Sequence, residues 1–147
     1  MQTWCRLATM SPSLPLRVAS IISAVNAAGH TLGGQSAWSP QGENTVLQAM
    51  RTTRFDVLGV SRTYLDFYLG FGFILSVFLV VQAVLLWQLS TVAKTDPQRV
   101  KGMVAVLGLG TLGCSIVSWK FLFAIPTVFS AVLTLCLGLA LFLAREA

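Results

Sequence analysis

The stretch that decides the fold is Phe67 to Ala93, FYLGFGFILSVFLVVQAVLLWQLSTVA, which lies between Asp66 and Lys94 and carries no charge. It exceeds the ~20 apolar residues that a helix needs to cross about 30 Å of hydrocarbon. Two later runs, 102–119 and 121–144, are also uncharged and apolar. The sequence therefore predicts membrane-spanning helices.

The composition of the whole chain agrees with this class of protein. Of 147 residues, 55% are hydrophobic and 10% are charged, and the mean hydropathy is +0.76. Ordinary soluble domains carry roughly 25% charged residues. The net charge is +5 but no dense basic run occurs, so we expect membrane lipids rather than nucleic acid as partners.

We predict an all-α membrane protein, a four-transmembrane-helix bundle that forms one domain over residues 1–147. The helix 98–118 has a clear start, because Asp96 is a good N-cap and Pro97 suits the first turn. The expected spans are 14–33, 63–89, 98–118 and 121–144, with an outer loop over 35–62.

The first span is the weakest of the four, because polar side chains interrupt it. We favour a retained span. The alternative is a signal peptide, with Arg17 as its charged region, Val18 to Val25 as its apolar core and a cleavage site around Asn26.

The outer loop is expected to hold a short helix at the membrane interface. Thr45 and Gln48 have the spacing of a capping box, and Val46, Leu47 and Met50 share one helical face. Trp38 and Phe55 are its predicted anchors; a lid over a cavity between the spans is the alternative.

Lysine and arginine positions predict that both termini are cytoplasmic. With four spans, six of these residues fall on the side of the termini and four on the other side, and the cytoplasmic side carries the excess. The six are Arg6, Arg17, Lys94, Arg99, Lys101 and Arg145; the four are Arg51, Arg54, Arg62 and Lys120.

Polar residues line one stripe of the first span. Ser23, Asn26, Ala27 and His30 follow helical spacing. This stripe is expected to face other helices or water, because an unpaired polar group is costly in hydrocarbon. It either joins the helix to the bundle or forms a ligand or proton site; a third interpretation leaves His30 in water above the membrane.

Asp66 stands at the start of the second span. With Thr63 it has capping-box spacing, and it is four residues after Arg62, within ion-pair reach. A functional alternative groups these charges with His30 at the outer membrane level. The candidate ligand-binding residues are His30, Arg62, Asp66, Asn26 and Tyr68.

No catalytic residues, metal site or cofactor are predicted. The run 108–113, GLGTLG, matches G-x-G-x-x-G, but it continues an apolar span and no acidic residue follows about 20 positions later. One histidine and three cysteines without a C-x-x-C pair argue against a metal site, and no disulfide framework is expected.

Small residues recur every fourth position on the last two spans. Such spacing lets helices approach closely in lipid. The two sets are Gly110, Cys114 and Ser118 on one span, and Ser130, Thr134 and Gly138 on the next.

Several short motifs resemble a family of small uncharacterised bacterial integral membrane proteins with four spans. The motifs are His30 to Gly34 (HTLGG), Trp38 to Pro40, Asp56 to Gly59, Ser61 to Thr63, Asp66 to Tyr68, Gly70 to Gly72, Gln82-Ala83 and Leu85 to Trp87. The resemblance implies a four-span architecture and the bacterial cytoplasmic membrane, and it implies no activity. It also implies that Met10 is the natural start and that Met1 to Thr9 is an upstream extension.

Three classes of function fit these patterns. The favoured one is a structural or accessory membrane protein that binds itself or a partner through small-residue helix faces. The alternative is a binding or transport module for a small lipophilic ligand at an outer-leaflet site near His30, Arg62 and Asp66. An enzyme is the weakest hypothesis, because no nucleophile stands beside a base.

Overall fold

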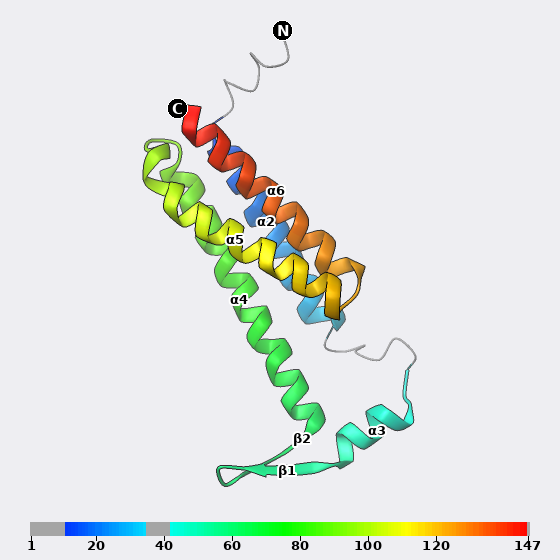
Figure 1. Ribbon diagram of the computed structural model, residues 1–147. Helices are drawn as coiled ribbons and strands as arrows, with labels where there is room; N and C mark the ends of the chain where they lie inside the picture. The colour runs from blue at the N-terminus through cyan, green and yellow to red at the C-terminus, as the bar shows by residue number, and fades with distance from the viewer. Residues whose placement is uncertain (1–10, 35–41, 147) are drawn as a thin grey trace. The chain divides into compact units, whose positions relative to one another are not determined.

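The computed structural model describes residues 11–34 and 42–146. The predictions made for Met1 to Thr9 and for Trp38 lie outside these residues. Figure 1 shows the helices and the hairpin. The elements are α2 (Ser13–Gly29), the π-helix η1 (His30–Gly34), α3 (Thr45–Thr52), β1 (Arg54–Val57), β2 (Val60–Thr63), α4 (Tyr64–Val92), α5 (Pro97–Phe121) and α6 (Ala124–Glu146).

Among residues 11–34 and 42–146, three helices are long and apolar enough to cross a membrane: α4, α5 and α6 as far as Arg145. Only 17%, 17% and 28% of the residues in their most apolar windows are buried. A soluble protein would cover such surface. These helices agree with the predicted spans at 63–89, 98–118 and 121–144. Helix α2 has 17 residues, fewer than the ~20 of a typical span, so the first span remains a prediction.

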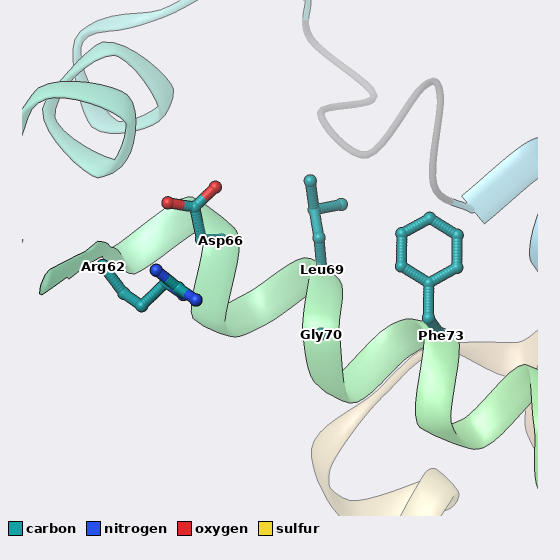
Figure 2. A pocket seen from close by; sticks show the side chains of 5 residues that line it. All are labelled: Arg62, Asp66, Leu69, Gly70 and Phe73. Carbon is teal, nitrogen blue, oxygen red and sulfur yellow. The ribbon is translucent and has the colours of Figure 1, made fainter. Parts of the chain in front are cut away.

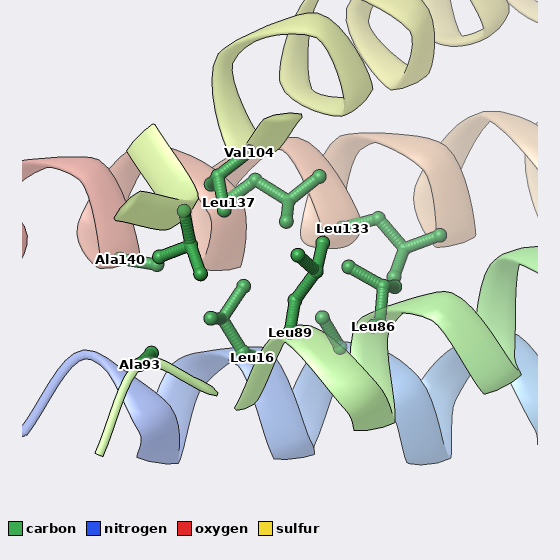
Figure 3. Packing of buried hydrophobic residues seen from close by; sticks show 10 residues of the cluster. Leu16, Leu86, Leu89, Ala93, Val104, Leu133, Leu137 and Ala140 are labelled. Carbon is green, nitrogen blue, oxygen red and sulfur yellow. The ribbon is translucent and has the colours of Figure 1, made fainter. Parts of the chain in front are cut away.

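The described chain divides into two compact units. The first contains the described residues up to Ala24 and those from Val81 onward. In it, α2, α4, α5 and α6 all contribute to one apolar core (Figure 3). The core residues are Leu16, Ala19, Leu86, Leu89, Ala93, Val100, Val104, Leu133, Leu137 and Ala140.

Helices α5 and α6 are packed against each other within this unit. The Thr134 hydroxyl donates to the Thr111 hydroxyl oxygen at 2.9 Å. A methyl group built on Gly108 would lie 3.7 Å from the Leu137 Cβ. The contact face of α5 therefore includes Gly108 and Thr111, whereas Gly110 and Cys114 of the predicted stripe are exposed.

The boundary between these two helices falls later than the sequence suggested. Helix α5 continues through Phe121, because the Leu122 N–H bonds to the Ser118 carbonyl at 2.9 Å and closes its last turn. The Lys120 charge does not end the helix; its ammonium group lies 5.2 Å from the Phe121 ring centre. At the other end, Asp96 caps α5 by accepting from the Arg99 N–H, with Pro97 in the first turn, as predicted.

The second unit, Val25–Val80, holds the end of α2, η1, α3, the β1–β2 hairpin and the start of α4. Helix α3 is capped by Asn44, whose side chain accepts from the Leu47 N–H at 2.9 Å. The predicted capping residue Thr45 is therefore wrong by one position, because the Asn44 oxygen already meets the free N–H of the first turn.

The hairpin departs from the all-α prediction. Strands β1 and β2 pair antiparallel, with Phe55 opposite Arg62 and Val57 opposite Val60. Leu58 and Gly59 form the turn and both have positive φ, 50° and 80°, as type I′ hairpin turns require. The segment predicted as an outer loop thus contains a two-stranded sheet directly before α4.

Candidate functional site

The candidate site lies where β2 ends and α4 begins, at Thr63 and Tyr64. The Asp66 carboxylate accepts from the Thr63 N–H at 3.0 Å, and the Thr63 hydroxyl accepts from the Asp66 N–H at 3.0 Å. This reciprocal pair is the predicted capping box. The direction of α4 relative to the hairpin is therefore fixed by local hydrogen bonds.

A shallow, open depression of about 380 Å³ lies beside this junction. Figure 2 shows the residues that line it: Arg62, Asp66, Leu69, Gly70 and Phe73. All five come from the end of β2 and from successive turns of α4. Because a single helix face supplies the lining, the depression is a groove along a helix and not an enclosed cavity.

Two arginines converge on one residue of the hairpin. Arg54 donates from Nε to the Ser61 hydroxyl at 3.2 Å, and Arg62 donates to the Ser61 carbonyl at 3.0 Å. The salt bridge within the described residues joins Arg51 to Glu43. Arg54 and Arg62 therefore form no ion pair within this part of the chain. Each guanidinium retains further N–H donors, which suit phosphate or carboxylate oxygens.

Aromatic rings join the hairpin to the first turns of α4. The Phe55 ring lies 5.0 Å from the Tyr64 ring and 5.6 Å from the Phe67 ring, measured between centres. Phe67 in turn packs edge-to-face on Phe71 at 4.9 Å. Such pairs stabilise by about 0.5–1.5 kcal/mol beyond burial, so the start of α4 and the hairpin form one packed element.

His30 meets a different part of α4. Its Nδ1 lies 3.0 Å from the Ser76 hydroxyl oxygen. The Ser76 hydroxyl donates to the Gly72 carbonyl at 3.2 Å, so its oxygen is left to accept a hydrogen bond from His30. The geometry therefore favours the imidazole tautomer with hydrogen on Nδ1.

The predicted site residues thus fall into separate places. Arg62 and Asp66 share the groove, but His30 does not line it. Its partner Ser76 is ten residues beyond Asp66 in the sequence, about 15 Å along the helix. Asn26 is half-buried, and Tyr68 is 42% exposed.

Part of the polar stripe of α2 is buried. Ser23 is fully buried and Ala27 is 4% exposed. One turn before Ser23, the Ser20 hydroxyl donates to the Ala83 carbonyl of α4 at 2.7 Å. Small and polar side chains of α2 therefore join it to α4.

Sequence reasoning missed the contribution of the hairpin, and with it Arg54 and Ser61. A signal was present: Gly59 stands in a two-residue turn, and Phe55 and Val57 alternate with polar residues before it. Leu58 weakened this signal, because asparagine or aspartate is the usual residue at the first position of such a turn. Among the described residues, no three metal-ligating side chains gather.

Comparisons of this chain with protein-family models, curated proteins and solved structures found no match.

Proposed function

We propose that this chain is a multi-pass membrane protein with four spans that serves as an accessory protein and binds a membrane partner or a second copy of itself. The observation that carries the proposal is the exposed apolar surface of α4, α5 and α6, which surrounds a core made by four helices. A bilayer would cover that surface. The first span would be α2 continued by η1.

A small-residue face of α5 is the proposed contact surface. Gly110, Gly113 and Cys114 are exposed, and a methyl group on either glycine would meet nothing within 4 Å. Helices associate in lipid through such faces, because small residues let two backbones approach closely.

We place both termini in the cytoplasm. In the first unit, Gln98 near the start of α5 donates to the Ala144 carbonyl near the end of α6 at 2.9 Å. The Arg17 guanidinium lies 4.9 Å from the Trp87 ring centre. These contacts bring the beginning of α2, the α4–α5 turn and the end of α6 to one end of the unit. The basic residues at this end of the unit are Arg17, Lys94, Arg99, Lys101 and Arg145, whereas Lys120 is at the opposite end.

Cross-linking in native membranes tests the accessory role. Cys114 is exposed on the proposed face, whereas Cys136 is half-buried against the core. In a Cys5→Ser background, a bismaleimide should give a heavier adduct that Cys114→Ala abolishes and Cys136→Ala leaves. Gly113→Leu should lower the yield of the adduct. A chain that forms no adduct through Cys114 would contradict the proposal.

Reporter fusions test the orientation. Alkaline phosphatase joined after Arg145 should be inactive in a bacterial host, and the same enzyme inserted at the α5–α6 turn should be active. The opposite pattern would reverse the topology.

Binding of a small lipophilic ligand is the second candidate. Within the part of the chain that the structure describes, the Arg62–Asp66 groove supports it, and that groove is open and lined largely by one helix face. We therefore give it second place.

A further inference from the structure

The hairpin of the second unit has two chemically different faces. Side chains alternate between the faces of a strand, and directly paired residues share a face. The pairing therefore places Phe55, Val57, Val60 and Arg62 on one face, the inner face. Arg54, Asp56, Ser61 and Thr63 lie on the other, the outer face.

Contacts with α4 show which way the inner face looks. The Phe55 ring packs on Tyr64 and Phe67, which are in the first turn of α4. Val57 follows two positions along the same strand, so it points to the side from which α4 leaves the hairpin. The inner face is therefore exposed to the same environment as the first turns of α4.

The exposed tip of the hairpin is apolar. Leu58 is 99% exposed, Val57 is 53% exposed and Val60 is 46% exposed. Leu58 also has a φ of 50°, a conformation that suits glycine or asparagine far better than leucine. In a turn surrounded by water, an apolar side chain at this position would gain no stabilisation from burial.

Figure 1 shows the hairpin running across the start of α4, with its tip away from α3. Helix α4 begins at Tyr64, immediately after β2, and is apolar enough to span a membrane. A segment joined to the first turn of a span lies at the level where that span enters the bilayer.

We propose that the β1–β2 hairpin is an interfacial anchor that lies on the lipid surface beside α4. Its inner face and Leu58 enter the boundary between head groups and acyl chains, while Arg62, on the inner face next to α4, contacts lipid phosphates. The anchor rests on the proposed membrane-spanning role of α4.

Charge and backbone chemistry favour a lipid surface at this depth. Arg62 retains N–H donors that match phosphate oxygens. The two-stranded sheet also leaves the outer edge of each strand unpaired. Open strand edges are not tolerated in the hydrocarbon core, but water and head groups satisfy them at the interface.

Fluorescence of single-cysteine variants tests the anchor. The full chain, with Cys5→Ser, Cys114→Ala and Cys136→Ala, receives a cysteine at Val57 on the inner face or at Asp56 on the outer face. A third variant, Leu109→Cys, reports on α5, where Leu109 is 70% exposed. Each carries an environment-sensitive dye and is reconstituted in phosphatidylcholine vesicles, with or without bromine on the lipid chains. Val60→Cys repeats the inner-face measurement at a second position.

We expect the dyes at Val57 and Leu109 to emit at a shorter wavelength than the dye at Asp56 and to be quenched by brominated lipid. The dye at Asp56 should instead be quenched by aqueous iodide. If Leu109 responds to brominated lipid while Val57 and Val60 behave like Asp56, the anchor is overturned and the span stands. If the inner-face dyes are shielded from both quenchers, a protein contact covers them and the anchor is overturned. If the dye at Leu109 is quenched by aqueous iodide and not by brominated lipid, the membrane-spanning proposal itself fails.

Discussion

Thr63 and Asp66 exchange two hydrogen bonds, each 3.0 Å long, across the first turn of α4. This pair explains a carboxylate at the start of an apolar helix without any ligand. It satisfies the Thr63 N–H, the Asp66 N–H and the Asp66 charge together.

Removing this cap should loosen the start of α4. Asp66→Ala is expected to destabilise this turn, because it removes the carboxylate that accepts from the Thr63 N–H. Hydrogen exchange at the amides of Tyr64 to Phe67 should accelerate, while exchange in α5 stays unchanged. Asp66→Asn keeps an oxygen that accepts from the Thr63 N–H, so it should accelerate the exchange less than Asp66→Ala does. Equal acceleration in both variants would show that charge, and not the hydrogen bond, holds the turn.

The His30–Ser76 contact predicts a measurable coupling between η1 and α4. We expect a double-mutant cycle of His30→Ala and Ser76→Ala to give a coupling energy of about 0.6 kcal/mol, the average for hydrogen bonds between membrane helices. Unfolding in detergent micelles titrated with a denaturing surfactant provides the free energies. The Thr52 hydroxyl donates to the Gln48 carbonyl within its own helix α3, so His30→Ala with Thr52→Ala is the additive control. Additivity for His30 and Ser76 as well would contradict the hydrogen bond.

Sequence patterns predicted the apolar helices well because membrane spans are marked by long uncharged runs, and the caps at Asp96 and Thr63–Asp66 because their signals are local. The α5–α6 face was harder to predict. Gly110 and Cys114, four residues apart, and Gly108 and Thr111, three residues apart, are two pairs of small residues on different faces of α5. Only the packing against Leu137 and Thr134 selects the second pair. The candidate cluster of His30 with Asp66 assumed that both lie at one membrane level, which sequence spacing does not establish.

Glycine substitutions distinguish the two faces of α5. Gly108 faces α6, and a Cβ there would make an ordinary contact with Leu137 at 3.7 Å. Gly108→Ala should therefore be tolerated, whereas Gly108→Leu should overpack the interface and cost about 1–3 kcal/mol. Gly113 has open space around it, so Gly113→Leu should not lower the free energy of unfolding of the monomer. Equal losses at both positions would contradict this assignment of faces.

Gln82 predicts a stabilising substitution. Its Nε2 is buried and has no hydrogen-bond partner among the described residues. A buried unsatisfied amide costs about 1–3 kcal/mol, and replacing it with an apolar group of similar shape removes that cost. Gln82→Leu should therefore raise the free energy of unfolding. Gln98 is the matched control, because its Nε2 donates to the Ala144 carbonyl at 2.9 Å; Gln98→Leu should lower stability by about 1 kcal/mol. A loss at Gln82 as large as that at Gln98 would mean that the Gln82 amide bonds to a group supplied by lipid, water or a partner, and would make Gln82 a candidate contact residue.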